Sequence, residues 1–187
     1  MNFLVFDTSC DNLTIALKKG NELLGYKSQE NRKGHSTVLL PEINNLLEKA
    51  KLSLKDIDYF GAVVGPGSFT GIRVGVATVN AFGYATGKKV IGVTSFEPFA
   101  YNVQDGKTIA IDAKHAFFLA TKQGEKLIYT TDEEHVLPSQ ATLIDQTALT
   151  PEMLEKAMMV KIEKNEFEKT IRPFYMRASE AERNLKK

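Results

Sequence analysis

A pattern of strands and turns occurs twice in this chain, and this repeat constrains the fold more than any other feature. In the first copy, an apolar run ends at Asp7, and a second apolar run leads to Gly20. Residues 108–132 again contain an apolar run that ends at Asp112, a turn, an apolar run, Gly124 and a third apolar run. The aspartate and the glycine are 13 residues apart in the first copy and 12 in the second. Two copies of one strand meander predict two related lobes.

Between the two copies the hydrophobic pattern changes its period. Apolar residues recur at helical spacing over Ser36–Lys51 and again over Thr70–Thr86. Tyr59–Val64 and Val90–Thr94 are apolar and rich in β-branched residues, so we expect a strand in each. The predicted strands of the first copy are Phe3–Phe6, Leu13–Lys18 and Leu23–Gln29. The predicted order of the first half is therefore β-β-β-α-β-α-β.

Duplicated lobes that each begin with a strand and an aspartate are typical of the actin-like α/β architecture (ASKHA, ribonuclease H-like) of sugar kinases and the Hsp70 ATPase. The second copy is shorter, because after Asp132 there are only a loop, a short apolar stretch and one helix candidate, Pro151–Met159. The polar stretch Gln104–Lys107 predicts a boundary. We expect a complete first lobe over residues 1–104 and a shortened second lobe with a C-terminal tail over residues 105–187.

Composition narrows the function classes. A formal net charge of +1 gives no global field that would attract nucleic acid or an anionic membrane. No segment has the roughly 18–20 apolar residues of a membrane helix, and no signal peptide pattern is present. The single cysteine, Cys10, excludes an internal disulfide and has no basic neighbour in sequence that would activate it. These features predict a cytoplasmic protein.

The stretch GPGSFTGIRVG, residues 65–75, lies between a predicted strand and a predicted helix. It lacks the lysine of a P-loop and the glycine spacing of a dinucleotide-binding fingerprint. Features that bind anions are nevertheless present, since Gly65 and Gly67 permit close backbone approach and Ser68 or Thr70 can cap the helix beside Arg73. The same residues suit a tight, capped connection, so both interpretations stay open.

The helix after this loop is unusually rich in glycine. Gly71, Gly75, Gly83 and Gly87 are separated by multiples of four residues, with Val79 in the gap. Glycine is about 1 kcal/mol less favourable than alanine inside a helix, so we expect close backbone approach to offset this cost. The glycine spacing fits a helix that lies close to the chain's own sheet, and it fits equally a helix that lies close to another helix. The leucine-rich helix before it offers a second apolar surface, which favours a partner.

The ionisable residues do not form a complete catalytic set. Asp7 and Asp112 each stand at a strand end, where actin-like proteins hold magnesium or water. Asp7 and Thr8 are candidate contacts for a nucleotide or an anion. His35, His115 and His135 have no partner at metal-ligand spacing, so we predict no metal site. A G-x-S-x-G nucleophile motif is absent, and we predict no catalytic residue.

Six motifs occur in one order and together resemble the bacterial TsaB (YeaZ) family over residues 2–177. They are FDTS (6–9), HSTVLLPEI (35–43), GPGSFTGIRVG (65–75), GVTSFE (92–97), IDAKH (111–115) and PFYMR (173–177). The glycine motif followed by I-R-x-G is highly specific to that family, whereas FDTS and IDAK alone are weak. In IDAKH, Lys114 replaces the arginine that is more frequent in the family.

The resemblance implies an accessory role. TsaB proteins are non-catalytic partners of the related enzyme TsaD, which carries an H-x-x-x-H metal site after the strand that corresponds to Val90–Thr94. This chain has no histidine over Ser95–Asn102. With TsaE, TsaD transfers a threonylcarbamoyl group to adenosine 37 of tRNAs reading ANN codons, and TsaC supplies the threonylcarbamoyl-adenylate donor. This chain alone would bind no cofactor, because ATP and magnesium enter the complex through its partners, and it would meet tRNA only indirectly.

The resemblance also implies an interface. The family forms homodimers or TsaD heterodimers through the helices that correspond to His35–Lys51 and Thr70–Gly87. The expected partner surface comprises His35, Leu39, Ile43, Arg73, Gly75, Val79 and Gly83. The alternative is a stand-alone actin-like small-molecule kinase or ATPase that uses Asp7 and the loop Gly65–Thr70. The shortened second lobe argues against it, since an actin-like nucleotide site needs loops from both lobes.

Overall fold

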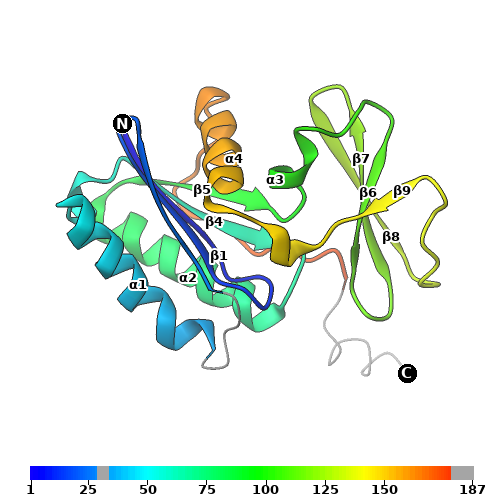
Figure 1. Cartoon of the computed structure of the whole chain (residues 1–187), viewed down its shortest axis with the longest axis horizontal. Helices are drawn as coiled ribbons and strands as arrows, with labels where there is room; N and C mark the ends of the chain where they lie inside the picture. The colour runs from blue at the N-terminus through cyan, green and yellow to red at the C-terminus, as the bar shows by residue number, and fades with distance from the viewer. Residues whose placement is uncertain (29–33, 178–187) are drawn as a thin grey trace.

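The computed structural model describes residues 1–28 and 34–177, and it contains two β-sheets that stand side by side (Figure 1). The first has five strands in the order β3-β2-β1-β4-β5. Its strands are β1 (Asn2–Asp7), β2 (Thr14–Lys19), β3 (Glu22–Lys27), β4 (Tyr59–Gly65) and β5 (Lys89–Thr94). Strand β1 pairs antiparallel with β2 and parallel with β4, so the strand ends that carry Asp7 and the glycine loop lie next to each other.

Helices cover both faces of this first sheet. Helices α1 (His35–Ala50) and α2 (Phe69–Thr86) lie below it, and α4 (Pro151–Glu163) lies above it (Figure 1). Leu4 and Phe6 of β1 pack toward α1 and α2, whereas Phe3 and Val5 pack toward α4. Because β1 is buried on both faces, its sequence is a continuous apolar run rather than an alternating one. A short 3-10 helix, η1 (Leu54–Asp56), precedes β4.

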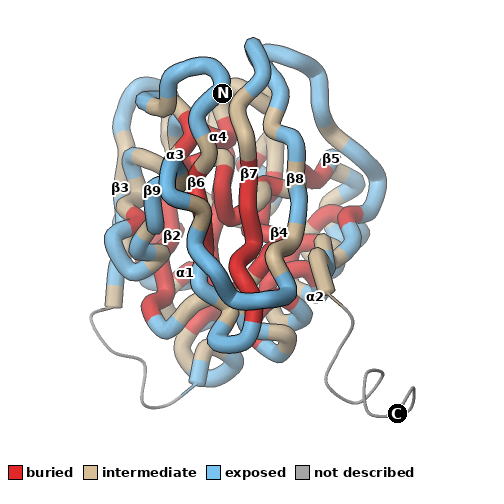
Figure 2. Tube along the Cα trace, turned by 90° about the vertical axis from the view of Figure 1, so that its right-hand side faces the viewer, coloured by how far each residue is buried: buried red, intermediate tan, exposed pale blue. Residues whose placement is uncertain are grey.

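The second sheet has four strands in the order β8-β7-β6-β9. They are β6 (Thr108–Asp112), β7 (Phe117–Gln123), β8 (Lys126–Asp132) and β9 (Ala141–Leu143). This order and the strand directions repeat β3-β2-β1-β4 of the first sheet. Ile109 and Phe118 pack toward the first sheet against Phe96, beside the short helix α3 (Glu97–Ala100). Figure 2 looks onto the opposite face, which no helix of the described residues covers.

The prediction of an α/β fold is confirmed, and the structure contains two sheets. The predicted strand end at Gln29 lies outside the described residues. Residues 105–187, the predicted second lobe and tail, do not all pack together. The apolar side of α4 packs on the first sheet, and Glu168 forms a β-bridge with Val90 of β5. The chain therefore returns to the first lobe after leaving the second sheet. Among the described helices, none is both long enough and apolar enough to cross a membrane.

Candidate functional site

A cleft of about 790 Å³ lies between the two sheets, where the ends of β1 and β6 meet. Ser9, Cys10, Gly67 and Ser68 line it from the first lobe, and Ile111, Asp112, Lys114 and Phe118 line it from the second. The 3-10 helix η2 (Gln146–Ala148) borders it between the lobes. The structure thus brings the two turns that follow the repeated aspartates into one cleft.

Asp7 lies beneath the surface of this cleft. Its side chain is 2% exposed, and its Oδ1 accepts a hydrogen bond of 2.6 Å from the Ser9 amide. Cys10 lies over it, with Sγ 3.9 Å from Asp7 Oδ2 and 3.8 Å from the Gln146 carbonyl oxygen. Burial raises the pKa of Asp7, although the hydrogen bonds from Ser9 and the nearby His35 oppose this. The carboxyl group is therefore separated from any ligand in the cleft.

The Cys10 thiol is correspondingly unreactive. Burial, together with the Asp7 carboxylate, raises the pKa of Cys10 to about 12. The backbone carbonyl of Cys10 is 2.6 Å from His35 Nε2, so His35 joins the start of α1 to the turn after β1. His35 was predicted at the partner surface, and the structure places it half-buried at this junction.

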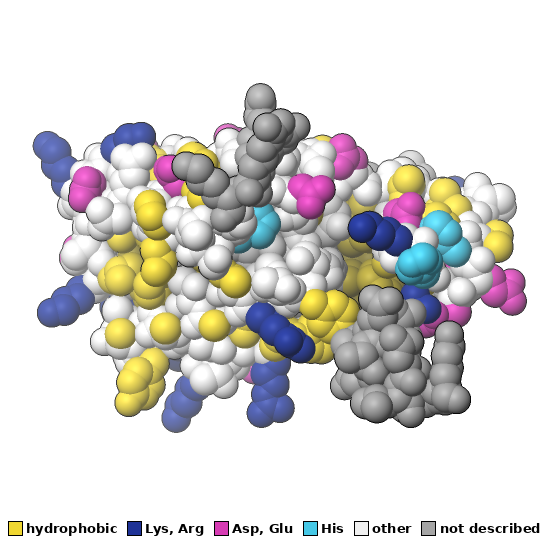
Figure 3. Space-filling model, turned by 90° about the horizontal axis from the view of Figure 1, so that it is seen from below, with side chains coloured by type: hydrophobic (Ala, Val, Ile, Leu, Met, Phe, Trp, Pro, Cys, Tyr) yellow, Lys and Arg dark blue, Asp and Glu magenta, His cyan; other side chains and the backbone are white. Residues whose placement is uncertain are grey.

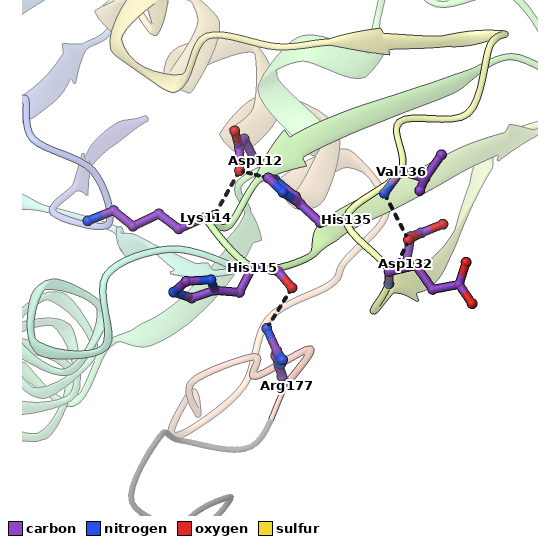
Figure 4. Close-up of polar contacts among 8 residues, drawn as sticks. Asp112, Lys114, His115, Asp132, His135, Val136 and Arg177 are labelled. Atoms are coloured by element: carbon purple, nitrogen blue, oxygen red, sulfur yellow. Dashed lines mark hydrogen bonds and ion pairs between the residues drawn. The ribbon is translucent and has the colours of Figure 1, made fainter.

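Asp112, the second aspartate of the repeat, is in a different environment (Figure 4). Its Oδ1 accepts hydrogen bonds from His135 Nε2 at 3.0 Å and from the Lys114 amide at 2.7 Å. These hydrogen bonds, led by that from His135, lower the pKa of Asp112. The His135 ring also stacks on Phe117, with ring centroids 4.5 Å apart. His135, which has no partner at metal-ligand spacing in the sequence, thus contacts both Asp112 and Phe117, because the chain after β8 folds back onto the sheet.

The glycine loop serves close packing of α2 on its own sheet. A Cβ on Gly71 would overlap the Thr8 carbonyl oxygen, and one on Gly75 would lie 2.6 Å from Thr8 Oγ1. Thr8 Oγ1 donates a hydrogen bond of 2.7 Å to the Gly71 carbonyl. Ser68 caps the helix, since its Oγ accepts from the Gly71 amide at 3.3 Å. Gly65 has a φ of 114° and lies in the buried turn.

Most of the predicted anion contacts do not reach the cleft. Of the six candidates, Gly67 and Ser68 line it. Asp7, Thr8 and Gly65 are buried, and Thr70 is exposed but is not part of the lining. Among the described residues, no group of three or more histidine, cysteine, aspartate or glutamate side chains is arranged to hold a metal ion.

Five of the predicted partner contacts belong to the core of this chain. They are Leu39, Ile43, Gly75, Val79 and Gly83, all of which are buried. Gly83, for example, faces β5, where an added Cβ would lie 2.5 Å from Val90 Cγ1. The glycine spacing therefore corresponds to contact between α2 and its own sheet, and these five residues have little exposed surface in the described chain.

The opposite side of these helices presents apolar groups to solvent. Its members are Leu40 of α1 and Arg73, Ala77, Ala81 and Tyr84 of α2, which we call the exposed helical surface. Tyr84 is 92% exposed and Leu40 is 52% exposed. Figure 3 shows hydrophobic side chains running across this lower face between lysine and arginine side chains. Beside Leu40, a groove of about 790 Å³ is lined by Leu47 of α1 and Phe82 of α2.

Sequence reasoning missed Leu40 and Tyr84 because it followed the glycine stripe. The sequence does contain a signal for the exposure of Leu40, namely the width of the apolar arc on the first helix. Leu39 and Leu40 are adjacent in the sequence and therefore point about 100° apart on a helix, so the apolar arc is wide and extends toward the exposed side. Arg73 is the one predicted interface residue that lies on the exposed helical surface.

The site and the fold define an α/β protein with two sheets of the same strand order, a cleft between them and an apolar helical surface on the first lobe. A family model described as "TsaD: tRNA N6-adenosine threonylcarbamoyltransferase" matches residues 25–176. YeaZ from Pseudomonas aeruginosa has a similar structure, with a TM-score of 0.74 at 21% sequence identity over 93% of this chain and 99% of that one.

Curated sequences agree with this assignment. A tRNA threonylcarbamoyladenosine biosynthesis protein TsaB from Buchnera aphidicola (subsp. Schizaphis graminum) is 33% identical over 52% of this chain and 46% of its own length. A tRNA N6-adenosine threonylcarbamoyltransferase from Thermodesulfovibrio yellowstonii is 31% identical over 52% of this chain and 34% of its own. The match to the TsaB relative thus spans about half of that protein. The chain belongs to the family that the model describes, and it is similar in sequence to TsaB proteins and in fold to YeaZ.

Proposed function

We propose that this chain is a non-catalytic partner of TsaD in the N6-threonylcarbamoylation of adenosine 37 in tRNAs reading ANN codons. The observation that carries the proposal is the exposed helical surface, and above all Tyr84, which is 92% exposed. Large apolar and aromatic groups gathered on one face are typical of protein interfaces. TsaB and TsaD relatives both match this sequence, which supports a pair of related chains that meet through related helices.

In this proposal the chain supplies a binding surface, and its partners supply the chemistry. TsaD transfers the threonylcarbamoyl group, TsaE is the ATPase, and TsaC makes the donor. ATP and magnesium enter through these partners, in the cytoplasm. In isolation the same surface would bring two copies of this chain together, and tRNA would be met through the complex.

A second candidate is a stand-alone small-molecule kinase or ATPase, and the cleft between the sheets favours it. A concave site of this size suits a small ligand. The position of Asp7 opposes it, because the carboxyl group is 2% exposed and lies beneath Cys10. Calorimetry of the isolated chain with ATP and magnesium distinguishes the candidates: micromolar binding supports a kinase or ATPase, and no heat of binding supports the TsaD partner.

The proposed function is tested by reconstitution. TsaD, TsaE and TsaC are combined with tRNA, threonine, bicarbonate and ATP, and the modified nucleoside is measured by mass spectrometry with and without this chain. We expect modification only when the chain is present. Equal modification without it, or none with it when the same TsaD works with another TsaB protein, would overturn the proposal.

A further inference from the structure

Arg73 is held in a fixed position at one end of the exposed helical surface. Its Nε donates a hydrogen bond of 2.9 Å to the Tyr175 hydroxyl, 102 residues further along the chain. The rings of Phe69 and Tyr175 are stacked with centroids 4.7 Å apart, and Arg73 Cζ lies 5.9 Å from each centroid. Two segments far apart in sequence thus cooperate to fix the direction of one guanidinium group.

The fixed guanidinium group retains most of its hydrogen-bonding capacity. It has five N–H donors, of which the Nε–H is used by Tyr175. Among the described residues, no aspartate or glutamate forms an ion pair with Arg73, whereas Arg177 is paired with Glu133 at 2.9 Å. The four Nη N–H groups of the exposed Arg73 are therefore available to an acceptor outside the chain.

The surroundings of Arg73 indicate the kind of acceptor. Thr70 and Ala77, its exposed neighbours on α2, are uncharged, and Phe69 and Tyr175 add apolar surface. Binding of a nucleic-acid backbone normally uses several cations that each meet a phosphate. An arginine braced by two aromatic rings beside an apolar surface is instead typical of a protein interface hot spot, where an arginine pairs with one carboxylate.

We infer that Arg73 is the receptor for one aspartate or glutamate side chain of the partner protein, which it binds end-on through its two Nη groups. This inference rests on the proposed function, because the partner is TsaD. The apolar neighbours exclude water when the surfaces meet, which strengthens a charge-assisted hydrogen bond. Phe69 and Tyr175 act as positioning residues, since they hold the guanidinium plane before the partner arrives.

The test compares three variants of the cluster with a matched control. Arg73→Gln removes the charge, Arg73→Lys keeps the charge but loses the planar fork, and Tyr175→Phe removes the Nε acceptor but keeps the ring. The control is Arg172→Gln, an exposed arginine outside the cluster. The dissociation constant for TsaD is measured by calorimetry at two salt concentrations, and thermal unfolding shows that each variant is folded.

We expect Arg73→Gln and Arg73→Lys each to weaken binding at least about tenfold, Tyr175→Phe to weaken it about threefold, and Arg172→Gln to change it less than about twofold. Wild-type affinity in Arg73→Lys would overturn recognition by the fork. If all Arg73 variants bind normally while Leu40→Asp does not, the inference fails and the proposed function stands. If Arg73→Gln lowers affinity for tRNA but not for TsaD, the acceptor is a phosphate and the inference is wrong. If the wild-type chain does not bind TsaD, both fail.

Discussion

The two sheets have the same strand order but differ in what covers them. The first sheet lies between α1 and α2 on one side and α4 on the other, whereas no helix of the described residues covers the outer face of the second (Figures 1 and 2). The outer face of the second sheet is covered in part by the connection from β8 to β9, residues 133–140, through the stack of His135 on Phe117. The same strand meander is thus the middle layer of a three-layer α/β/α arrangement in the first lobe, whereas in the second lobe helices do not cover its outer face.

The repeated aspartates show the same contrast at the level of single groups. Asp7 ends β1 under Cys10 and is 2% exposed, so burial raises its pKa. Asp112 ends β6 at the surface, where the hydrogen bond from His135 lowers its pKa. The layers around a strand end, rather than the motif in the sequence, decide which protonation state the carboxyl group favours.

The two sheets should differ most in how far a core substitution lowers the free energy of unfolding. Phe60 of β4 is fully buried and packs against Phe82 of α2 with ring centroids 5.4 Å apart. Phe60→Ala should lower the free energy of unfolding by about 4 kcal/mol, because it leaves a cavity between layers. Phe117→Ala on the outer face of the second sheet should cost about 2 kcal/mol, because solvent and the 133–140 segment can fill the space. Equal losses in urea unfolding would show that the second sheet is packed as tightly as the first.

Substitutions on the two sides of α2 should have effects with different causes. Gly71→Ala should cost about 3 kcal/mol, because the new methyl group overlaps the Thr8 carbonyl and forces the helix away from its sheet. The control, Ala81→Gly on the exposed side, should cost about 1 kcal/mol through helix propensity alone. Thermal unfolding of both variants tests this, and a stabilised Gly71→Ala protein would mean that α2 does not approach the sheet so closely.

The aspartates should respond to pH in opposite directions. The raised pKa of Asp7 gives a stabilising contribution that is present at low pH and is lost as pH rises through its folded pKa. Asp7→Asn should therefore raise stability at pH 7 by on the order of 1 kcal/mol, and this gain should shrink toward pH 4. The lowered pKa of Asp112 stabilises the protein above about pH 4 and this contribution is lost as pH falls.

Asp112→Asn should consequently lower stability at pH 7, by about 0.5 kcal/mol or less, since water screens this exposed pair. Melting temperatures of the wild type and both variants, measured between pH 3 and pH 8, show how the effect of each substitution on stability changes with pH. Curves for Asp7→Asn and Asp112→Asn that deviate from the wild type in the same direction would contradict the assignment of one buried and one exposed carboxyl group.

The sequence predicted the parts of the fold that depend on local pattern. The strand meanders and both long helices follow from the hydrophobic period. The return of α4 to the first sheet did not follow, because its fit depends on Pro151 against Gly25 and Met158 against Gly61, which are contacts across more than 90 residues. The glycine stripe predicted a partner surface on α1 and α2, but the structure packs this stripe on the chain's own sheet, since glycine spacing does not distinguish a chain's own sheet from a partner.

The central claim is that the exposed helical surface of the first lobe, and not the second sheet, binds the partner. Leu40 and Leu143 form a matched pair for its test, because they are 52% and 51% exposed in the two lobes. The affinity of Leu40→Asp and Leu143→Asp for TsaD is the most direct measurement. The account predicts a loss of at least about thirtyfold for Leu40→Asp and less than about twofold for Leu143→Asp. A loss confined to Leu143→Asp, or equal in both, would contradict it.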